Sequence, residues 1–118
     1  MSLKEGSAAA KRHAHAPIFA ALGDETRLSL LAKLGRGQRY SISQLTEGSQ
    51  LTRQAITKHL RVLERVKVVR CVRCGRERLF EIDQQPVEEA RDYLDRISEQ
   101  WNQALSGLKS FVEAERPD

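Results

Sequence analysis

The sequence contains few residues of the kinds that build disulfide scaffolds, membrane spans or aromatic binding platforms. Its 118 residues include two cysteines, one tryptophan, two tyrosines and three phenylalanines. No apolar run approaches the ~18 residues that a membrane-spanning helix requires, and residues 1–17 hold no apolar segment typical of a secretory signal. We therefore expect a cytoplasmic protein in a reducing compartment, with no membrane segment and no disulfide framework.

Residues for catalysis and for metal binding are equally scarce. The sequence contains no nucleophile–base pair, no glycine-rich phosphate loop and no paired-carboxylate site, so we expect neither an enzyme nor a cofactor. His13 and His15 precede the first apolar segment, and the sequence favours surface positions for both. Residues 41–51 and 86–118 contain no Cys or His, and acidic side chains alone bind soft metals poorly.

The sequence does contain a concentrated positive charge. Residues 52–81 hold nine Lys/Arg and three acidic residues, a net charge of +6, whereas residues 82–118 hold four and nine, a net charge of −5. A basic stripe on ordered structure is typical of proteins that bind nucleic acid. Because six aromatic residues cannot provide the stacking platforms of RNA readers, double-stranded DNA is the expected partner.

Capping signals predict two helices near the start of the chain. Residues 1–15 are rich in Ala, Ser, Lys and His and predict a flexible arm. Pro17, which favours a first helical turn, opens a short apolar segment over residues 16–22. Asp24 is a candidate N-cap of the next helix. The buried face of that helix is expected to contain Leu28, Leu31 and Leu34, which repeat at helical spacing.

Two closely spaced helices follow. Ser41 and Gln44 match a capping box that predicts a short helix from Ile42 to Glu47. Thr52 is a candidate N-cap of a second helix that reaches about Val66. Roughly four residues separate the two helices, which is the spacing of a helix-turn-helix.

The second of these helices is apolar on one side and basic on the other. Ile56, Leu60 and Leu63 fall at helical spacing and predict a buried face. The opposite face is polar and basic, as a helix in the major groove of DNA would be. That face contains Gln54, Thr57, Lys58 and Arg61, with Arg53 and His59 beside them.

After Lys67 the pattern predicts a β-hairpin. Apolar residues recur on both sides of a turn at residues 74–77, where Gly75 can adopt a positive φ. Folding does not explain the three arginines that crowd the tip, which are Arg73, Arg76 and Arg78. Contact with phosphates or with the minor groove explains them, and a solvated tip is the alternative.

Cys71 and Cys74 form a C-x-x-C sequence on the predicted hairpin. A structural zinc site needs four ligands, and no second cysteine pair is present. Residues three apart on a strand point to opposite faces, although the turn could bring the two thiols together. The sequence favours plain strand residues, with a redox-sensitive pair as the second interpretation and a metal site as the third.

The C-terminal region predicts one long helix from about Pro86. Its apolar residues repeat with alternating spacings of three and four, an unbroken heptad pattern through Val87, Ala90, Leu94, Ile97, Trp101, Ala104, Leu108 and Phe111. A helix of ~27 residues spans about 40 Å, more than the rest of a small domain can cover. We expect pairing with a second copy of the chain rather than folding over its own core, with Trp101 as the main anchor.

Three segments resemble the ArsR-type (arsenic-repressor-like) family of winged helix-turn-helix transcriptional regulators. They are residues 20–31 (AALGDETRLSLL), residues 51–63 (LTRQAITKHLRVL) and residues 75–80 (GRERLF), in the family's order and spacing. The resemblance implies a mainly α-helical fold with a small hairpin, the wing. It also implies a homodimer, formed through the N- and C-terminal helices, that binds a palindromic operator and usually represses transcription.

The resemblance also assigns roles to residues. Operator contacts fall on Thr52, Arg53, Gln54, Thr57, Lys58, His59 and Arg61 of the recognition helix, and on Arg73, Arg76 and Arg78 of the wing. For His59, a structural hydrogen bond is an equally weighted alternative. The dimer interface falls on Phe19, Leu94, Ile97, Trp101, Leu108 and Phe111. The implied organisation is an arm over 1–15, a DNA-binding domain over 16–84 and a dimerisation helix over 85–114.

The sequence departs from the family at its sensing sites. One family metal site uses cysteines near the first helix of the helix-turn-helix, and another uses Asp, His and Glu on the C-terminal helix. Both ligand sets are missing here, as is the paired-cysteine arrangement of the family's sulfur sensors. An unknown effector, a thiol-redox switch at Cys71 and Cys74, and a winged helix used for protein–protein contact remain as alternatives.

Overall fold

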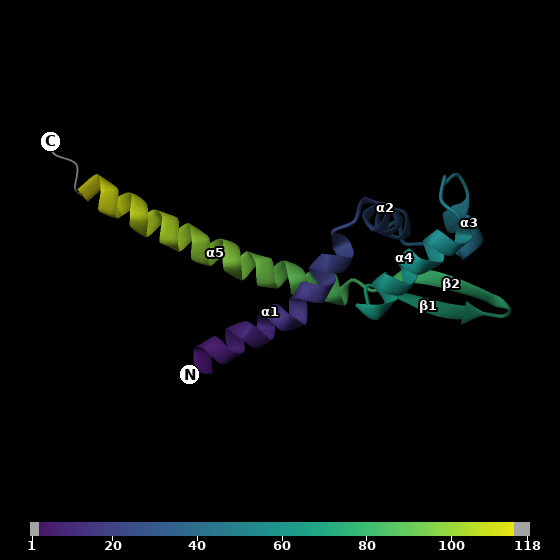
Figure 1. Cartoon of the computed structure of the whole chain (residues 1–118), viewed down its shortest axis with the longest axis horizontal. Helices are drawn as coiled ribbons and strands as arrows, with labels where there is room; N and C mark the ends of the chain where they lie inside the picture. Colours follow the sequence, from purple (N-terminus) through teal and green to yellow (C-terminus); the bar gives the residue numbers. More distant parts are fainter. Residues whose placement is uncertain (1–2, 115–118) are drawn as a thin grey trace.

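The computed structural model describes residues 3–114, which form five helices and a two-stranded sheet. Figure 1 shows two parts: a head, and two helices that cross each other and extend from it. The head, defined here as residues 25–82, contains α2 (Glu25–Leu34), α3 (Ile42–Thr46), α4 (Arg53–Arg65), β1 (Val69–Cys74) and β2 (Glu77–Ile82). The other two helices are α1 (Leu3–Leu22) and α5 (Gln85–Ala114), and the molecule extends 73 × 36 × 22 Å.

The caps of the helices in the head lie where the sequence predicts them. Asp24 accepts a hydrogen bond from the Arg27 N–H, and Thr52 accepts one from the Ala55 N–H at the start of α4. Ser41 and Gln44 form both hydrogen bonds of the capping box that opens α3. The helix-turn-helix prediction is therefore confirmed, with α3 ending one residue earlier than expected.

The hairpin also matches the prediction. Strands β1 and β2 pair antiparallel from Val69–Ile82 to Cys74–Glu77, and the turn holds Gly75 at a φ of 64°. A single residue of the α2–α3 connection, Tyr40, adds an isolated bridge to Phe80, with hydrogen bonds of 3.1 and 2.7 Å. This bridge attaches the hairpin to the segment just before α3.

The hydrophobic core of the head lies between α2, α3, α4 and the hairpin. Its most deeply buried side chains include Leu34, Ile56, Leu60, Leu63 and Val69. The apolar face predicted for α4 is therefore correct. A second cluster, in which Ile18, Val68 and Ala90 are buried, joins the end of α1 to the start of α5.

The expectation for α2 is partly wrong. Leu30 and Leu34 are its buried residues, whereas the Leu28 side chain is 52% exposed. At 100° per residue, Leu28 and Leu30 lie on nearly opposite faces of the helix. The stripe that faces the core is therefore Leu30, Leu31 and Leu34.

The start of the chain also differs from the expectation. Helix α1 begins at Leu3 and runs through Pro17, so residues 3–15 are helical where a flexible arm was predicted. The stretch before Pro17 is rich in Ala, Lys and Arg, which are strong helix formers. Helix α1 also packs on α5, where the ring of His15 stacks on Tyr93 with centroids 4.7 Å apart.

Helix α5 has an apolar face that the described residues leave exposed. After Ala90, which is buried, Leu94 is 49% exposed and Trp101 is 67% exposed. Leu105, Leu108, Phe111 and Val112 are also exposed. Within residues 3–114, no helix is long and apolar enough to cross a membrane.

Candidate nucleic-acid interface

The outward face of α4 brings together five of the side chains predicted to read DNA. Arg53, Gln54, Lys58 and Arg61 are exposed, and with Thr57 they line a shallow depression of about 420 Å³. Within the described part of the chain, no acidic side chain forms an ion pair with any of these basic residues. Their charges are therefore available to an anionic partner.

Two threonines shape the N-terminal half of this face. The Thr52 hydroxyl accepts from the Ala55 N–H at 3.1 Å, which fixes the first turn of α4. The Thr57 hydroxyl donates to the Arg53 carbonyl at 2.7 Å, so its hydrogen atom is already used within the helix. The methyl group of Thr57 is the part left for contact, and thymine methyl groups are suitable apolar partners for it.

The wing presents a second group of arginines. Arg73 and Arg78 lie directly opposite each other in the strand register, and Arg76 lies in the turn. Like charges opposite each other destabilise a hairpin, so folding does not favour this pair. Because side chains alternate along a strand, Arg78 is on the same face as Phe80, which packs in the core. Both arginines therefore lie on the α4 side of the hairpin.

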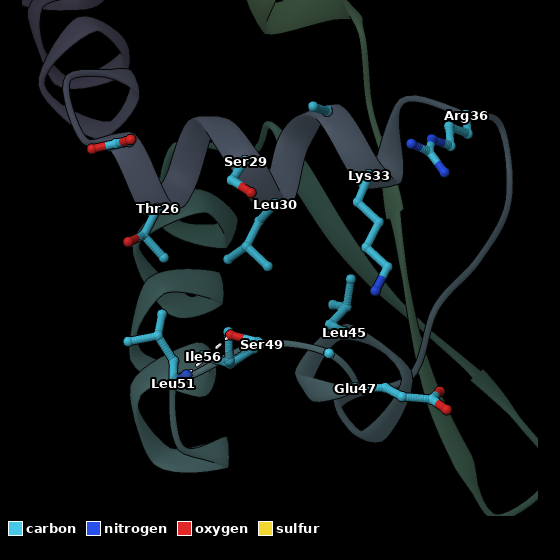
Figure 2. Close-up of a pocket in the computed structure, with 13 residues that line it drawn as sticks. Thr26, Ser29, Leu30, Lys33, Arg36, Leu45, Glu47, Ser49, Leu51 and Ile56 are labelled. Carbon is cyan, nitrogen blue, oxygen red and sulfur yellow. Dashed lines mark hydrogen bonds between the residues drawn. The ribbon is translucent and has the colours of Figure 1, made fainter.

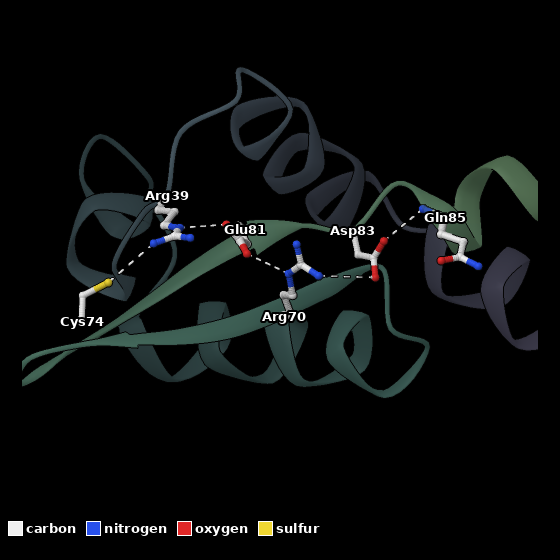
Figure 3. Close-up of polar contacts among 6 residues, drawn as sticks. All are labelled: Arg39, Arg70, Cys74, Glu81, Asp83 and Gln85. Carbon is white, nitrogen blue, oxygen red and sulfur yellow. Dashed lines mark hydrogen bonds and ion pairs between the residues drawn. The ribbon is translucent and has the colours of Figure 1, made fainter.

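The opposite face of the wing is held by a chain of ion pairs, shown in Figure 3. Glu81 accepts from Arg39 at 2.8 Å and from Arg70 at 2.7 Å, and Arg70 also lies 3.9 Å from Asp83. The hydrogen bonds from these two arginines lower the pKa of Glu81, and the hydrogen bond between Arg39 and Glu81 raises the pKa of Arg39. This network ties the wing to the α2–α3 connection.

Sequence reasoning missed Arg39 and Tyr40, which approach the hairpin from the α2–α3 connection. Arg39 contacts Glu81, 42 residues later in the chain, and donates to the Cys74 sulfur at 3.7 Å. No local pattern predicts a pairing over that separation. Arg39 therefore adds a positive charge near the wing that the sequence could not have placed there.

The structure places His59 on the side of α4 that faces the α1–α2 corner. Its Nδ1 atom lies 3.3 Å from Arg27 Nη1 and 3.8 Å from the Asp24 carboxylate, and its side chain is 23% exposed. The structural hydrogen bond that the sequence left open is therefore present. His59 does not line the depression formed by the other predicted residues of α4.

The two cysteines lie on opposite faces of β1. Cys71 pairs with Phe80 and Cys74 pairs with Glu77, and both thiols are free and exposed. At about 3.3 Å per residue, their α-carbons are about 10 Å apart, beyond the ~7 Å limit of a disulfide. A bond between them therefore requires β1 to break.

A groove of about 590 Å³ lies beside the basic face, between α2, α3 and the turn before α4 (Figure 2). Leu30, Leu45 and Ile56 lie along its floor, and its rim includes Lys33, whose amine donates to the Gln44 carbonyl at 3.0 Å. The rim carries charges of both signs, since Glu25, Glu47, Lys33 and Arg36 all line it. This mixed charge does not suit a polyanion.

Residues predicted for the dimer interface are divided between the two helices outside the head. Phe19 is half-buried and packs near Tyr93, with ring centroids 6.2 Å apart. On α5, Ile97 is half-buried, and Leu94, Trp101, Leu108 and Phe111 are exposed. Leu105 and Val112, which the heptad pattern did not include, widen the exposed apolar face.

Comparison with known proteins finds similar transcriptional regulators. The chain is 29% identical over 98 residues to the HTH-type transcriptional regulator Rv2034 of Mycobacterium tuberculosis, which covers 83% of this chain and 88% of that protein. It is 36% identical over 77 residues to the HTH-type transcriptional regulator YuzN of Bacillus subtilis, which covers 60% of this chain and 84% of that protein. No model of a known protein family matches the chain.

A solved structure is similar over most of the chain. It is an ArsR-like transcriptional regulator from Rhodococcus sp. RHA1, with 35% sequence identity and a TM-score of 0.77. The match covers 84% of this chain and 92% of that one. The matched length exceeds that of the head, so the similarity extends beyond the head.

Proposed function

The chain belongs to the ArsR family of winged helix-turn-helix transcriptional regulators, and from that premise we propose that it represses transcription as a homodimer bound to a palindromic operator. The proposal places it with its DNA, in the cytoplasm. Its similar proteins are named as transcriptional regulators rather than as enzymes. The observation that carries the proposal is the basic face of α4, whose Lys and Arg side chains form no ion pair within the described residues.

The face of α4 supplies the base-reading side chains. Arg53, Lys58 and Arg61 can donate to guanine, and Gln54 can pair with adenine. Thr52 lies at the helix N-terminus, where backbone N–H groups favour a phosphate. The wing arginines Arg73, Arg76 and Arg78 bind the flanking backbone or the minor groove.

The exposed face of α5 supports the homodimer. A patch of large apolar side chains from Leu94 to Val112 is rare on a monomer and marks an interaction surface. In this arrangement residues 16–84 form the DNA-binding domain and residues 85–114 the dimerisation helix. Two copies place their α4 helices in successive major grooves, about 34–36 Å apart.

The test is binding to labelled duplex DNA, measured by fluorescence anisotropy at two salt concentrations. The probes are a duplex from the region upstream of this protein's gene, duplexes selected from a randomised pool, and a scrambled control. We expect a clear preference for one native or selected duplex, a selected sequence with inverted symmetry, and affinity that falls steeply with salt. Equal, weak binding to every duplex would contradict the proposal.

Repression is tested separately from DNA binding. A reporter gene is placed behind the bound duplex, and its expression is compared with and without the protein. Lower expression in the presence of the protein supports a repressor, whereas higher expression would show an activator.

Geometry does not favour the two alternative functions, a thiol-redox switch and a protein-contact module. A Cys71–Cys74 disulfide requires β1 to break, and a protein-contact role leaves the basic face unexplained.

A further inference from the structure

One side chain connects three helices at the corner where α1 ends, α2 begins and α4 passes. The Arg27 guanidinium donates through Nε to the Ala21 carbonyl at 2.5 Å and through Nη2 to the Ala20 carbonyl at 3.4 Å. Its Nη1 atom lies 3.3 Å from His59 Nδ1 on α4. Its backbone N–H donates to the Asp24 carboxylate, the N-cap of α2, at 3.0 Å.

The chemistry of these groups fixes the direction of each contact. The last carbonyls of a helix have no donor within the helix, so the guanidinium satisfies two of them at the end of α1. Arginine has only donors, so His59 Nδ1 must accept the hydrogen bond.

His59 lies next to Lys58 and two residues from Arg61, both on the outward face of α4. A small rotation of α4 about its axis moves all three side chains together, since they share a rigid helix. The contact with Arg27 is thus well placed to determine which way the basic face points. The orientation of α4 is determined relative to α1, because a carbonyl of α1 accepts a hydrogen bond from the same guanidinium.

We propose that Arg27 and His59 form a positioning pair that sets the orientation of α4 relative to α1. In the dimer, the pair thereby sets the orientation of one recognition helix relative to the other. The inference rests on the proposed function, because it takes α4 as the reading helix and α1 as part of the dimer. Neither side chain touches DNA in this role.

The charged groups against the ring of His59 are Arg27 on α2 and Asp24 at the N-cap of that helix, whose carboxylate lies 3.8 Å from Nδ1. Both groups lie at the corner where α1 ends and α2 begins, so the polar contacts of His59 hold α4 to that corner.

The positioning role has an expected effect that distinguishes it from a direct DNA contact. Loss of the contact between Arg27 and His59 should lower the affinity for the operator, while the affinity for a scrambled duplex stays the same.

The experiment compares Arg27→Ala, His59→Ala and His59→Gln with the unmodified dimer, on selected and scrambled duplexes. Arg27→Ala is expected to lower operator affinity about tenfold, with scrambled affinity and salt slope unchanged. His59→Ala removes the acceptor and should give the same result. The amide oxygen of His59→Gln can accept from Arg27, so that variant should keep the operator-to-scrambled affinity ratio, and His13→Gln, a control at an exposed position on α1, should follow the unmodified protein.

Opposite results would overturn the inference. Equal loss of operator and scrambled affinity in Arg27→Ala would reduce Arg27 to a stability role. An operator-to-scrambled affinity ratio in His59→Ala that matches the unmodified protein would remove His59 from the pair. A salt slope reduced by about one in His59→Ala would make His59 a direct phosphate contact.

Hydrogen exchange separates this inference from the proposed function. In the free protein, Arg27→Ala should speed amide exchange in α4 and leave residues 101–114 unchanged. Unchanged protection of α4 would overturn the positioning contact, whatever the DNA result. If the unmodified protein prefers no duplex while α4 responds in this way, the proposed function fails and the contact stands.

Discussion

The head and the second half of α5 bury apolar side chains in opposite ways. In the head, Leu63 is 0% exposed, because α2, α3, α4 and the hairpin enclose it. In α5, Trp101 is 67% exposed, although it is the largest apolar side chain of the chain. Figure 1 shows why: beyond its crossing with α1, α5 extends away from every other element.

The difference shows which part of the molecule is complete in one copy. The head buries its apolar residues and leaves a basic face for a partner of opposite charge. The second half of α5 leaves its apolar residues uncovered, so its natural partner is another apolar surface. The two regions are therefore expected to respond differently to mutation, and the following predictions run from the largest expected effect to the smallest.

Leu63→Ala should give the largest effect, a loss of unfolding free energy of the head. Removing a fully buried leucine leaves a cavity and costs about 2–5 kcal/mol of unfolding free energy. Chemical denaturation followed by circular dichroism measures the loss. Leu105→Ala on the exposed face of α5 is the matched control in dilute monomer, and a similar loss there would remove the contrast between the two regions.

Trp101→Ala should weaken association rather than folding. Truncating a large aromatic anchor at an interface costs roughly 2–3 kcal/mol, or about a 100-fold weaker dimer. Sedimentation equilibrium gives the dimer constant, and circular dichroism checks that the head remains folded. Gln103→Ala, on the same helix, is the control. An intact Trp101→Ala dimer at low micromolar concentration would contradict the heptad interpretation.

Lys58→Ala should affect neither the core nor the dimer. Losing one base or phosphate contact is expected to lower operator affinity about tenfold at moderate salt. Anisotropy measures the affinity, and thermal melting should show an unchanged midpoint. Arg76→Ala tests the wing in the same way, with Arg96→Ala on α5 as the charge-matched control. Unchanged affinity in both Lys58→Ala and Arg76→Ala would contradict the proposed reading surface.

Glu81→Gln should give the smallest effect, limited to the base of the wing. The pKa of Glu81 is lowered from its ordinary value of 4.5 by hydrogen bonds from Arg39 and Arg70. The ionised carboxylate therefore stabilises the folded state above about pH 4.5 and loses this contribution as the pH falls through its lowered pKa. The stability difference between the two proteins, measured by urea denaturation at several pH values, should shrink toward acid pH. A difference that stays constant would exclude the ion pairs as its source.

Local sequence signals predicted the elements of the head well. Asp24, Ser41 and Thr52 each cap a helix where expected, because a cap depends on a side chain and a backbone N–H within three residues. The hairpin turn and the buried face of α4 follow from equally short-range patterns. Five of the residues predicted to read DNA lie on one face of α4, because a helix fixes their relative angles; they are Arg53, Gln54, Thr57, Lys58 and Arg61.

Other features depended on contacts between distant residues. Segments about 40 residues apart are joined by the β-bridge between Tyr40 and Phe80 and by the ion pair between Arg39 and Glu81. The exposure of Leu28 and the passage of α1 through Pro17 depend on which neighbours cover each helix. The sequence also did not reveal the proposed role of Arg27, because nothing in residues 20–31 indicates that its side chain reaches α4.

The sequence by itself determined the helix boundaries of the head, the turn of the hairpin, the heptad spacing of α5 and the separation of a basic segment from an acidic one. These properties follow from backbone geometry, capping and side-chain periodicity, which act over a few residues. Only the tertiary structure decided that His59 faces Arg27 rather than the basic face, that Arg39 pairs with Glu81, and that Trp101 is exposed. These outcomes depend on how rigid elements pack in three dimensions, and the sum of local preferences does not determine that packing.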